Sequence, residues 1–234
     1  MRQRTKVVKG VGGGGGQFGR FPATAVLIAI NVIVYLVEIA GGTGGLNNPS
    51  GTFVFDYALQ GASVAEGEWY RLITGGFLHA NLLHIGFNML LLFFLGRLLE
   101  PALGTTRFLA LYFACLLAGS FGALALTNPL EITLGASGAI FGLAGATFVI
   151  ARGRGMDAVA GEIGFLIIFN LVFSFTAANV SVGGHLGGLV AGVICGLAIV
   201  AGERGRLGRK RLPAELLLIA AVAAISVVGA LIVA

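Results

Sequence analysis

The sequence contains few charged residues: Asp, Glu, Lys and Arg make up 11% of its 234 residues, whereas 57% are hydrophobic. Its mean hydropathy is +0.96. A water-soluble domain of this size could not bury so much apolar surface in its own core. The scarcity of charge therefore excludes an ordinary soluble protein and predicts an all-α polytopic membrane protein.

Cysteine is also scarce. The two cysteines, Cys115 and Cys195, fall in apolar runs, which predicts buried free thiols and gives no indication of a redox compartment. No secretory signal peptide is predicted. The basic N-terminus leads through the glycine run at 12–16 into a full-length hydrophobic segment without a cleavage pattern.

The apolar segments predict seven membrane-spanning helices, since a span needs about 20 mostly apolar residues. The predicted spans are 22–40, 79–96, 106–127, 137–151, 160–178, 184–201 and 213–234. The mixed segment 41–78 is expected to form a structured loop at the membrane interface, where Trp69 and Tyr70 would lie at the headgroup level. We therefore divide the chain into a disordered basic, glycine-rich tail at 1–20, a six-helix core at 21–203, and a basic loop with an additional helix at 204–234.

Lysine and arginine indicate the topology. If the N-terminus is cytoplasmic, every one of the 15 basic residues except Arg71 falls on the cytoplasmic side, as the positive-inside rule requires. Seven spans then leave the C-terminus outside. If the short fourth span were omitted, every later loop would move to the opposite side of the membrane. Because the basic residues are concentrated in the predicted cytoplasmic segments, the net charge of +5 reflects the membrane topology and does not predict nucleic-acid binding.

Most of the strongly polar side chains in the predicted spans lie at one depth. His79, His84 and Asn88 are in the first half of the second span. Ser137 opens the fourth span, and His185 lies near the start of the sixth. These three spans all run from outside to inside, so the five residues share the outer half of the membrane. Polar groups are costly in lipid and usually face a protein interior or a water-filled cavity, which makes this group a candidate functional site.

Glycines recur every four residues in the fourth and sixth spans. Gly138 and Gly142 lie on the fourth, and the sixth carries Gly184, Gly188, Gly192 and Gly196. Small residues at this spacing let helix backbones approach closely. If the two stripes face each other, the starts of the two helices bring Ser137 and His185 together.

The residue types at this depth suit nucleophilic catalysis. A serine hydroxyl such as Ser137 needs a base within hydrogen-bond reach, and His185 is the candidate. The helix start supplies unpaired N–H groups and a positive dipole end for a developing oxyanion. His84 and Asn88 share a helix face and could donate to it. No carboxylate is suitably placed as a third member, so we predict a dyad whose histidine is oriented by packing, with Phe141 stacked against it.

Four short motifs occur in order on the same predicted side of the membrane. They are "EWYR" at 68–71, "HANLLHIGFN" at 79–88, "GASG" at 135–138 and "GGHLGGLVAGV" at 183–193. Together they resemble the Trp-x-Arg, His-x4-His-x3-Asn, Gly-x-Ser-Gly and glycine-rich histidine motifs of the rhomboid family of intramembrane serine proteases. The resemblance covers about 22–201. It implies a six-helix proteolytic core, followed in this chain by an additional C-terminal helix.

The resemblance also implies residue roles. Ser137 would be the nucleophile and His185 the general base. His84, Asn88 and the Ser137 backbone N–H would form the oxyanion hole, with Gly135 supporting the serine motif. The family often has tyrosine where this chain has Phe141. No cofactor or metal is implied, and the substrates would be other membrane proteins, cut in or near their transmembrane segments within the lipid bilayer.

The role of His79 stays open. It is five residues from His84, which rotates it off that helix face, so it is either a structural residue or a contact for water or substrate. Localisation follows from the topology: we expect an integral protein of a bacterial plasma membrane with a cytoplasmic N-terminus. The sequence does not indicate the oligomeric state.

Two other classes of function remain possible. In the first, His79, His84 and His185 hold a catalytic zinc ion, although the i,i+5 spacing of the first two suits metal ligands poorly. In the second, a non-catalytic relative binds transmembrane clients, although such a protein would need neither Ser137 nor His185.

Overall fold

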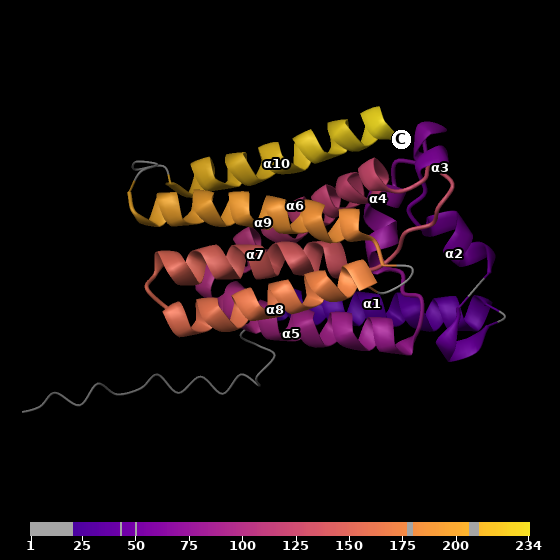
Figure 1. Cartoon of the computed structure of the whole chain (residues 1–234), viewed down its shortest axis with the longest axis horizontal. Helices are drawn as coiled ribbons and strands as arrows, with labels where there is room; N and C mark the ends of the chain where they lie inside the picture. Colours follow the sequence, from indigo (N-terminus) through magenta and orange to yellow (C-terminus); the bar gives the residue numbers. More distant parts are fainter. Residues whose placement is uncertain (1–20, 43, 50, 177–179, 206–210) are drawn as a thin grey trace, which may run out of the picture.

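A computed structural model describes residues 21–42, 44–49, 51–176, 180–205 and 211–234 (Figure 1). The predicted tail at 1–20 lies outside these residues. Over the described part the chain is helical, and its only strand-like pairing is one isolated bridge between Leu59 and Thr133. The long helices lie side by side along the longest axis of the molecule (Figure 1). The prediction of an all-α polytopic membrane protein is confirmed.

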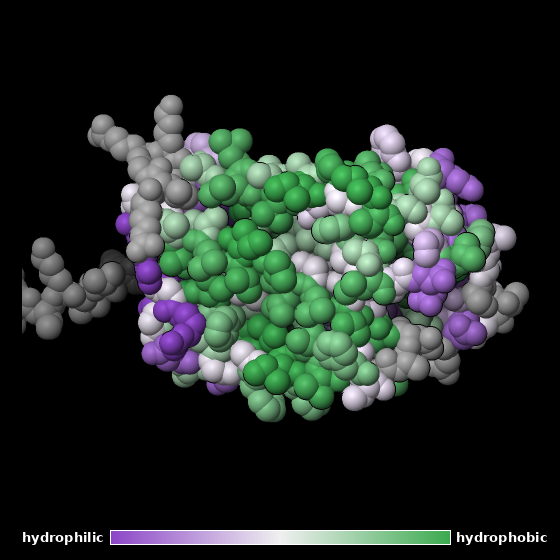
Figure 2. Space-filling view, turned by 45° about the horizontal axis from the view of Figure 1, so that its top comes forward, coloured by the Kyte–Doolittle hydropathy of each residue, from purple (hydrophilic) through white to green (hydrophobic). Residues whose placement is uncertain are grey.

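Six of the described helices are long and apolar enough to cross a membrane, and a seventh, shorter apolar helix lies among them. In chain order the seven are α1 (Pro22–Gly41), α5 (Leu82–Leu103), α6 (Thr105–Leu126), α7 (Ser137–Gly153), α8 (Asp157–Thr176), α9 (Val182–Glu203) and α10 (Arg211–Val233). The shorter one is α7, which corresponds to the predicted fourth span. A broad hydrophobic band covers the middle of the face shown in Figure 2, with hydrophilic residues at both ends, as expected of a protein surrounded by lipid.

The second predicted span was placed wrongly at both ends. It was expected at 79–96, but α5 begins at Leu82 and continues through Pro101 to Leu103. The physical reason for the later start is a helix cap: the Asn81 side chain accepts a hydrogen bond from the backbone N–H of His84 at 2.9 Å. His79 therefore precedes the helix and does not belong to the span.

The segment between α1 and α5 is a structured loop, as predicted. It contains the short helices η2 (Gly45–Asn47), α2 (Thr52–Tyr57), α3 (Gly61–Ala65), α4 (Arg71–Thr74) and η3 (Gly75–Phe77). The buried Arg71 guanidinium holds it together by donating to the backbone carbonyls of Phe55 at 2.6 Å and Ala58 at 2.8 Å. Trp69 and Tyr70 are exposed, in keeping with an interfacial position.

Glycines bring the backbones of α7 and α9 together, as the sequence predicted. A Cβ atom at Gly188 would overlap the carbonyl oxygen of Gly138, and one at Gly192 would overlap that of Gly142. Helix α6 approaches α9 in the same way, because a Cβ at Gly122 would overlap the Gly183 carbonyl. These three helices form the centre of the bundle. Lipid offers little hydrophobic drive between helices, so this close packing is a principal source of their association.

Buried carboxylates attach outer helices to their neighbours. Glu100 of α5 accepts hydrogen bonds from the backbone N–H groups of Ala23 and Thr24 at 2.9 and 2.8 Å, so an anion caps the positive N-terminus of α1. The fully buried Glu215 of α10 pairs with Arg107 of α6 at 3.0 Å. Helix α10 lies on the outside of the bundle along α9 and α6 (Figure 1).

Replacing a central glycine should destabilise the bundle. In Gly192→Ala the new methyl group has to displace the backbone of α7, so we expect the free energy of unfolding to fall by about 1–3 kcal/mol. Gly161→Ala on α8 is the matched control, because no atom lies within 4 Å of a Cβ there and alanine is the better helix former. Thermal unfolding in detergent measures both variants. Equal melting temperatures would show that the α7–α9 contact tolerates a methyl group.

Candidate active site

Two helix starts position Ser137 and His185. Ser137 is the first residue of α7, and His185 lies in the first turn of α9, which is capped by the Ser181 side chain accepting from the Gly184 N–H at 3.1 Å. Both helices start at the same end of the bundle (Figure 1). Their glycines also face each other, so the two side chains come into contact. Ser137 Oγ lies 2.8 Å from His185 Nε2, within hydrogen-bond distance.

Phe141 stacks on the His185 ring. The ring centroids are 4.2 Å apart and the planes are inclined by 18°. Both side chains are buried, His185 being 7% exposed. The sequence predicted this stack, and it holds the plane of the imidazole against α7.

Sequence reasoning missed a further contact of the histidine. Nδ1 of His185 lies 2.6 Å from Oγ of Ser174, a buried residue near the end of α8. The prediction that packing alone orients this ring is therefore incomplete. A signal was present: Ser174 is a polar side chain within an apolar span, at the end that the predicted topology places outside with the other polar residues.

Gly135 leaves room for His84 next to the serine. A Cβ on Gly135 would lie 2.8 Å from Nε2 of His84 and 3.8 Å from Ser137 Oγ. Gly135 also has a φ of +125°, a backbone conformation that residues other than glycine rarely adopt. The imidazole of His84 therefore reaches the edge of the serine site. Its Nδ1 is turned away and accepts from the Ala80 N–H at 3.3 Å.

Asn88 lies one turn beyond His84 on α5. It is 4% exposed, and its amide nitrogen donates to the backbone carbonyl of His84 at 3.0 Å. An amide nitrogen has two protons, so one remains for another acceptor. The predicted site residues Ser137, His185, His84 and Asn88 thus come from α5, α7 and α9 at one end of the bundle.

His79 is near this group but is buried away from solvent. Its ring makes an edge contact with the His84 ring at a centroid distance of 5.1 Å, and the side chain is 1% exposed. Burial, with a smaller contribution from nearby His84, lowers the pKa of His79 to about 3, so its ring stays neutral. The Glu38 carboxylate of α1 accepts from the His79 backbone N–H at 3.2 Å. These contacts favour a structural role over contact with water.

The loop before α7 is fixed to the loop before α5. Leu59 and Thr133 exchange backbone hydrogen bonds of 3.0 and 2.8 Å, and the Gly135 N–H donates to the Gly75 carbonyl at 2.9 Å. The backbone just before Ser137 is therefore held by the interfacial segment.

Comparison with known proteins assigns the family. The model of the Rhomboid domain matches residues 66–202, which is more than half of the chain. The chain belongs to the rhomboid family. This confirms the resemblance carried by the four motifs. His84, Asn88, Ser137, Ser174 and His185 all lie within the matched rhomboid domain.

Relatives of this rhomboid chain include named proteases. Rhomboid protease GluP of Bacillus subtilis (strain 168) is 35% identical over 210 residues, which is 88% of this chain and 40% of the relative. The putative rhomboid protease YdcA of the same organism is 38% identical over 128 residues, 53% of this chain and 63% of the relative. Rhomboid protease AarA of Providencia stuartii is 29% identical over 145 residues, 56% and 51% of the two chains. The chain thus spans 40% to 63% of the length of these relatives.

We expect Ser137 to react with a fluorophosphonate, a probe that labels activated serines. Gly135→Ala should abolish this reaction, because its methyl group would displace His84 from the serine. Gly155→Ala is the control for strain alone: Gly155 has φ +74° but no atom within 4 Å of a Cβ. It should cost about 1–2 kcal/mol of stability and leave labelling unchanged. The labelling rates of the two folded variants distinguish displacement of His84 from backbone strain. An equal loss in both would mean that backbone strain, not the His84 contact, accounts for the requirement for glycine.

Proposed function

We propose that this rhomboid protein is an intramembrane serine endopeptidase with a Ser137–His185 dyad that cleaves peptide bonds in or near the transmembrane segments of membrane proteins. The observation that carries the proposal is the 2.8 Å distance between Ser137 Oγ and His185 Nε2 at the start of α7. The relatives named as proteases support the reaction class.

The dyad would act by nucleophilic catalysis. Ser137 Oγ attacks the carbonyl carbon of the scissile bond while His185 Nε2 takes the hydroxyl proton. The same proton then passes to the leaving amine as the carbon–nitrogen bond breaks. Water, deprotonated by His185, hydrolyses the acyl-enzyme and restores Ser137. Water has to reach the start of α7, which lies close to one end of the bundle.

The oxyanion of the tetrahedral intermediate would be stabilised from two sides. The backbone N–H of Ser137 and the positive end of the α7 dipole lie on one side. His84, and the second amide proton of Asn88, lie on the adjacent face of α5. Gly135 permits this arrangement by leaving space between His84 and Ser137.

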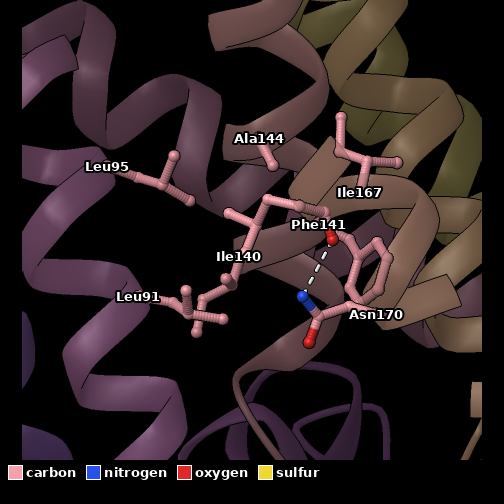
Figure 3. A pocket seen from close by; sticks show the side chains of 8 residues that line it. Leu91, Leu95, Ile140, Phe141, Ala144, Ile167 and Asn170 are labelled. Atoms are coloured by element: carbon pink, nitrogen blue, oxygen red, sulfur yellow. Dashed lines mark hydrogen bonds between the residues drawn. The ribbon is translucent and has the colours of Figure 1, made fainter. Parts of the chain in front are cut away.

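A small apolar pocket lies next to the dyad. It is bounded by α5, α7 and α8 and lined by Leu91, Leu95, Ile140, Phe141, Ala144, Leu166, Ile167 and Asn170 (Figure 3). The Asn170 amide donates to the Leu166 carbonyl at 2.8 Å, so its nitrogen is already paired. Since Phe141 both lines this pocket and stacks on His185, the pocket adjoins the base.

For the orientation, we propose a cytoplasmic N-terminus. The C-terminal ends of α5, α7 and α9 share one end of the bundle, and the starts of α7 and α9, where the site lies, are at the other end (Figure 1). The basic residues favour the cytoplasm for the first end, so the site would be reached from outside.

The other two functions have less support. Within the described residues, which include all three histidines, no three His, Cys, Asp or Glu side chains lie close enough to share a metal ion, so the zinc hydrolase is not favoured. A non-catalytic client-binding role would leave the paired Ser137 and His185 unexplained, and the relatives above are named proteases.

The dyad predicts covalent labelling. The purified protein in detergent should react with a fluorophosphonate, and Ser137→Ala and His185→Ala should both lose the reaction because one lacks the nucleophile and the other its base. Ser226→Ala should react like the wild type, because the Ser226 hydroxyl bonds only to its own helix at the Val222 carbonyl. A folded wild type that stays unlabelled would refute the serine mechanism.

The proposed oxyanion hole predicts a separate effect of Asn88. Asn88→Ala should lower the fluorophosphonate reaction rate by about 10²-fold, the scale for one oxyanion donor, without a matching loss of melting temperature. Asn31→Ala is the matched control, since the Asn31 amide likewise donates to a carbonyl one turn earlier in its own helix, at Leu27, but on α1. An unchanged rate in Asn88→Ala would remove this residue from the oxyanion hole.

A further inference from the structure

Both ring nitrogens of His185 have a serine partner. Nε2 lies 2.8 Å from Ser137 Oγ, and Nδ1 lies 2.6 Å from Ser174 Oγ on the opposite edge of the ring. Ser174 is 2% exposed, whereas most side chains of α8 are exposed or half-buried. The other buried residues of α8 are Ala160 and Ile163, near its start. This hydroxyl is therefore buried on a helix that buries little else.

The hydrogen bonds of Ser174 fix the direction of the protons. Its Oγ lies 2.7 Å from the backbone carbonyl of Asn170, which can only accept. The single hydroxyl proton therefore points to Asn170, and a lone pair of Oγ faces His185. Nδ1 then has to be the donor and carry the ring proton. In a neutral imidazole this leaves Nε2 unprotonated and able to accept the proton of Ser137.

We propose that Ser174 is the positioning residue for His185: by accepting a hydrogen bond from Nδ1–H it selects the tautomer and ring orientation in which Nε2 faces Ser137. The inference rests on the proposed serine mechanism for its catalytic consequence, but the tautomer itself can be observed without any reaction. Ser174 exchanges no proton in this role. When Nε2 takes the proton of Ser137, Nδ1–H remains bonded to the Ser174 oxygen, which faces the positive charge of the imidazolium.

Stacking on Phe141 cannot supply this selection. A stacked imidazole can rotate by about 180° about its bond to Cβ and keep the same plane, which exchanges the positions of ring nitrogens and ring carbons. Only one of the two orientations places Nδ1 against Ser174 and Nε2 against Ser137. Phe141 thus fixes the plane of the ring, and Ser174 fixes its orientation within that plane.

A purely structural serine would need no contact with His185. The hydroxyl of a serine within a helix commonly donates a hydrogen bond to the backbone carbonyl one turn earlier. Ser226 of α10 does so with the Val222 carbonyl at 2.8 Å. Ser174 makes that same bond to Asn170 and, in addition, contacts Nδ1. Ser226 is buried to a similar degree, so Ser226→Ala is the matched control for loss of a buried hydroxyl on a transmembrane helix.

The first measurement is the tautomer of His185 in the full-length protein in detergent. The chain has three histidines, so ¹⁵N-histidine spectra are simple, and the His185→Ala variant assigns the signals. At about pH 8, where an ordinary imidazole is neutral, we expect a protonated Nδ1 and an unprotonated Nε2. Ser174→Ala should show a shift toward the Nε2–H form, whereas Ser174→Thr and Ser226→Ala should keep the wild-type pattern. An Nε2–H tautomer in the wild type overturns the proposal, and this result does not depend on the folding of any Ser174 variant.

The second measurement is the rate of fluorophosphonate labelling. Ser174→Ala should react about tenfold more slowly than the wild type, the scale of one lost hydrogen bond, while Ser174→Thr restores the rate to within about threefold. Wild-type rates and tautomer in a folded Ser174→Ala variant would overturn the role of Ser174. A wild type that shows the Nδ1–H tautomer but does not react would instead refute the serine mechanism and leave the positioning contact supported.

Discussion

The site depends on the distance between the backbones of α7 and α9. Gly138 and Gly142 on one helix face Gly188 and Gly192 on the other so closely that a single Cβ would overlap a carbonyl oxygen. Ser137 and His185 lie at the same end of this contact, so the backbone distance sets the distance between their side chains. In lipid the hydrophobic effect contributes little to the association of helices. Close packing of the two backbones therefore provides a large part of the free energy that holds them together. Stability and geometry of the site therefore have the same origin.

Several polar groups in and around the site have hydrogen-bond partners within the protein. Glu38 receives the backbone N–H of His79, Asn88 donates to His84, and Ser174 donates to Asn170. An unpaired polar group within a membrane protein costs several kcal/mol, so each of these bonds favours one arrangement of the helices over others. The interfacial loop contributes in the same way by holding the backbone before Ser137.

Helix α8 differs from its neighbours. It is among the least buried of the membrane-spanning helices, yet it lines the apolar pocket through Leu166 and Ile167 and contacts His185 through Ser174. Its position therefore affects both the lining of this pocket and the orientation of the proposed base. The hydrogen bond between Ser174 and His185 directly links these two features.

The sequence by itself determined the membrane class, the seven spans and the common depth of Ser137, His185, His84 and Asn88. These features follow from local composition and from helix periodicity, which the chain carries whatever its tertiary contacts. The facing glycine stripes could also be predicted, because their four-residue spacing marks one side of each helix. The start of α5 could not be predicted from the sequence. The hydropathy pattern places it at residue 79, whereas the Asn81 cap makes the helix begin at Leu82. Only the tertiary structure decided that Ser174 meets His185 and that Glu38 holds the backbone of His79. Both contacts depend on how each helix is rotated about its axis, and α8, apolar on nearly all sides, carries no periodic pattern that specifies its rotation.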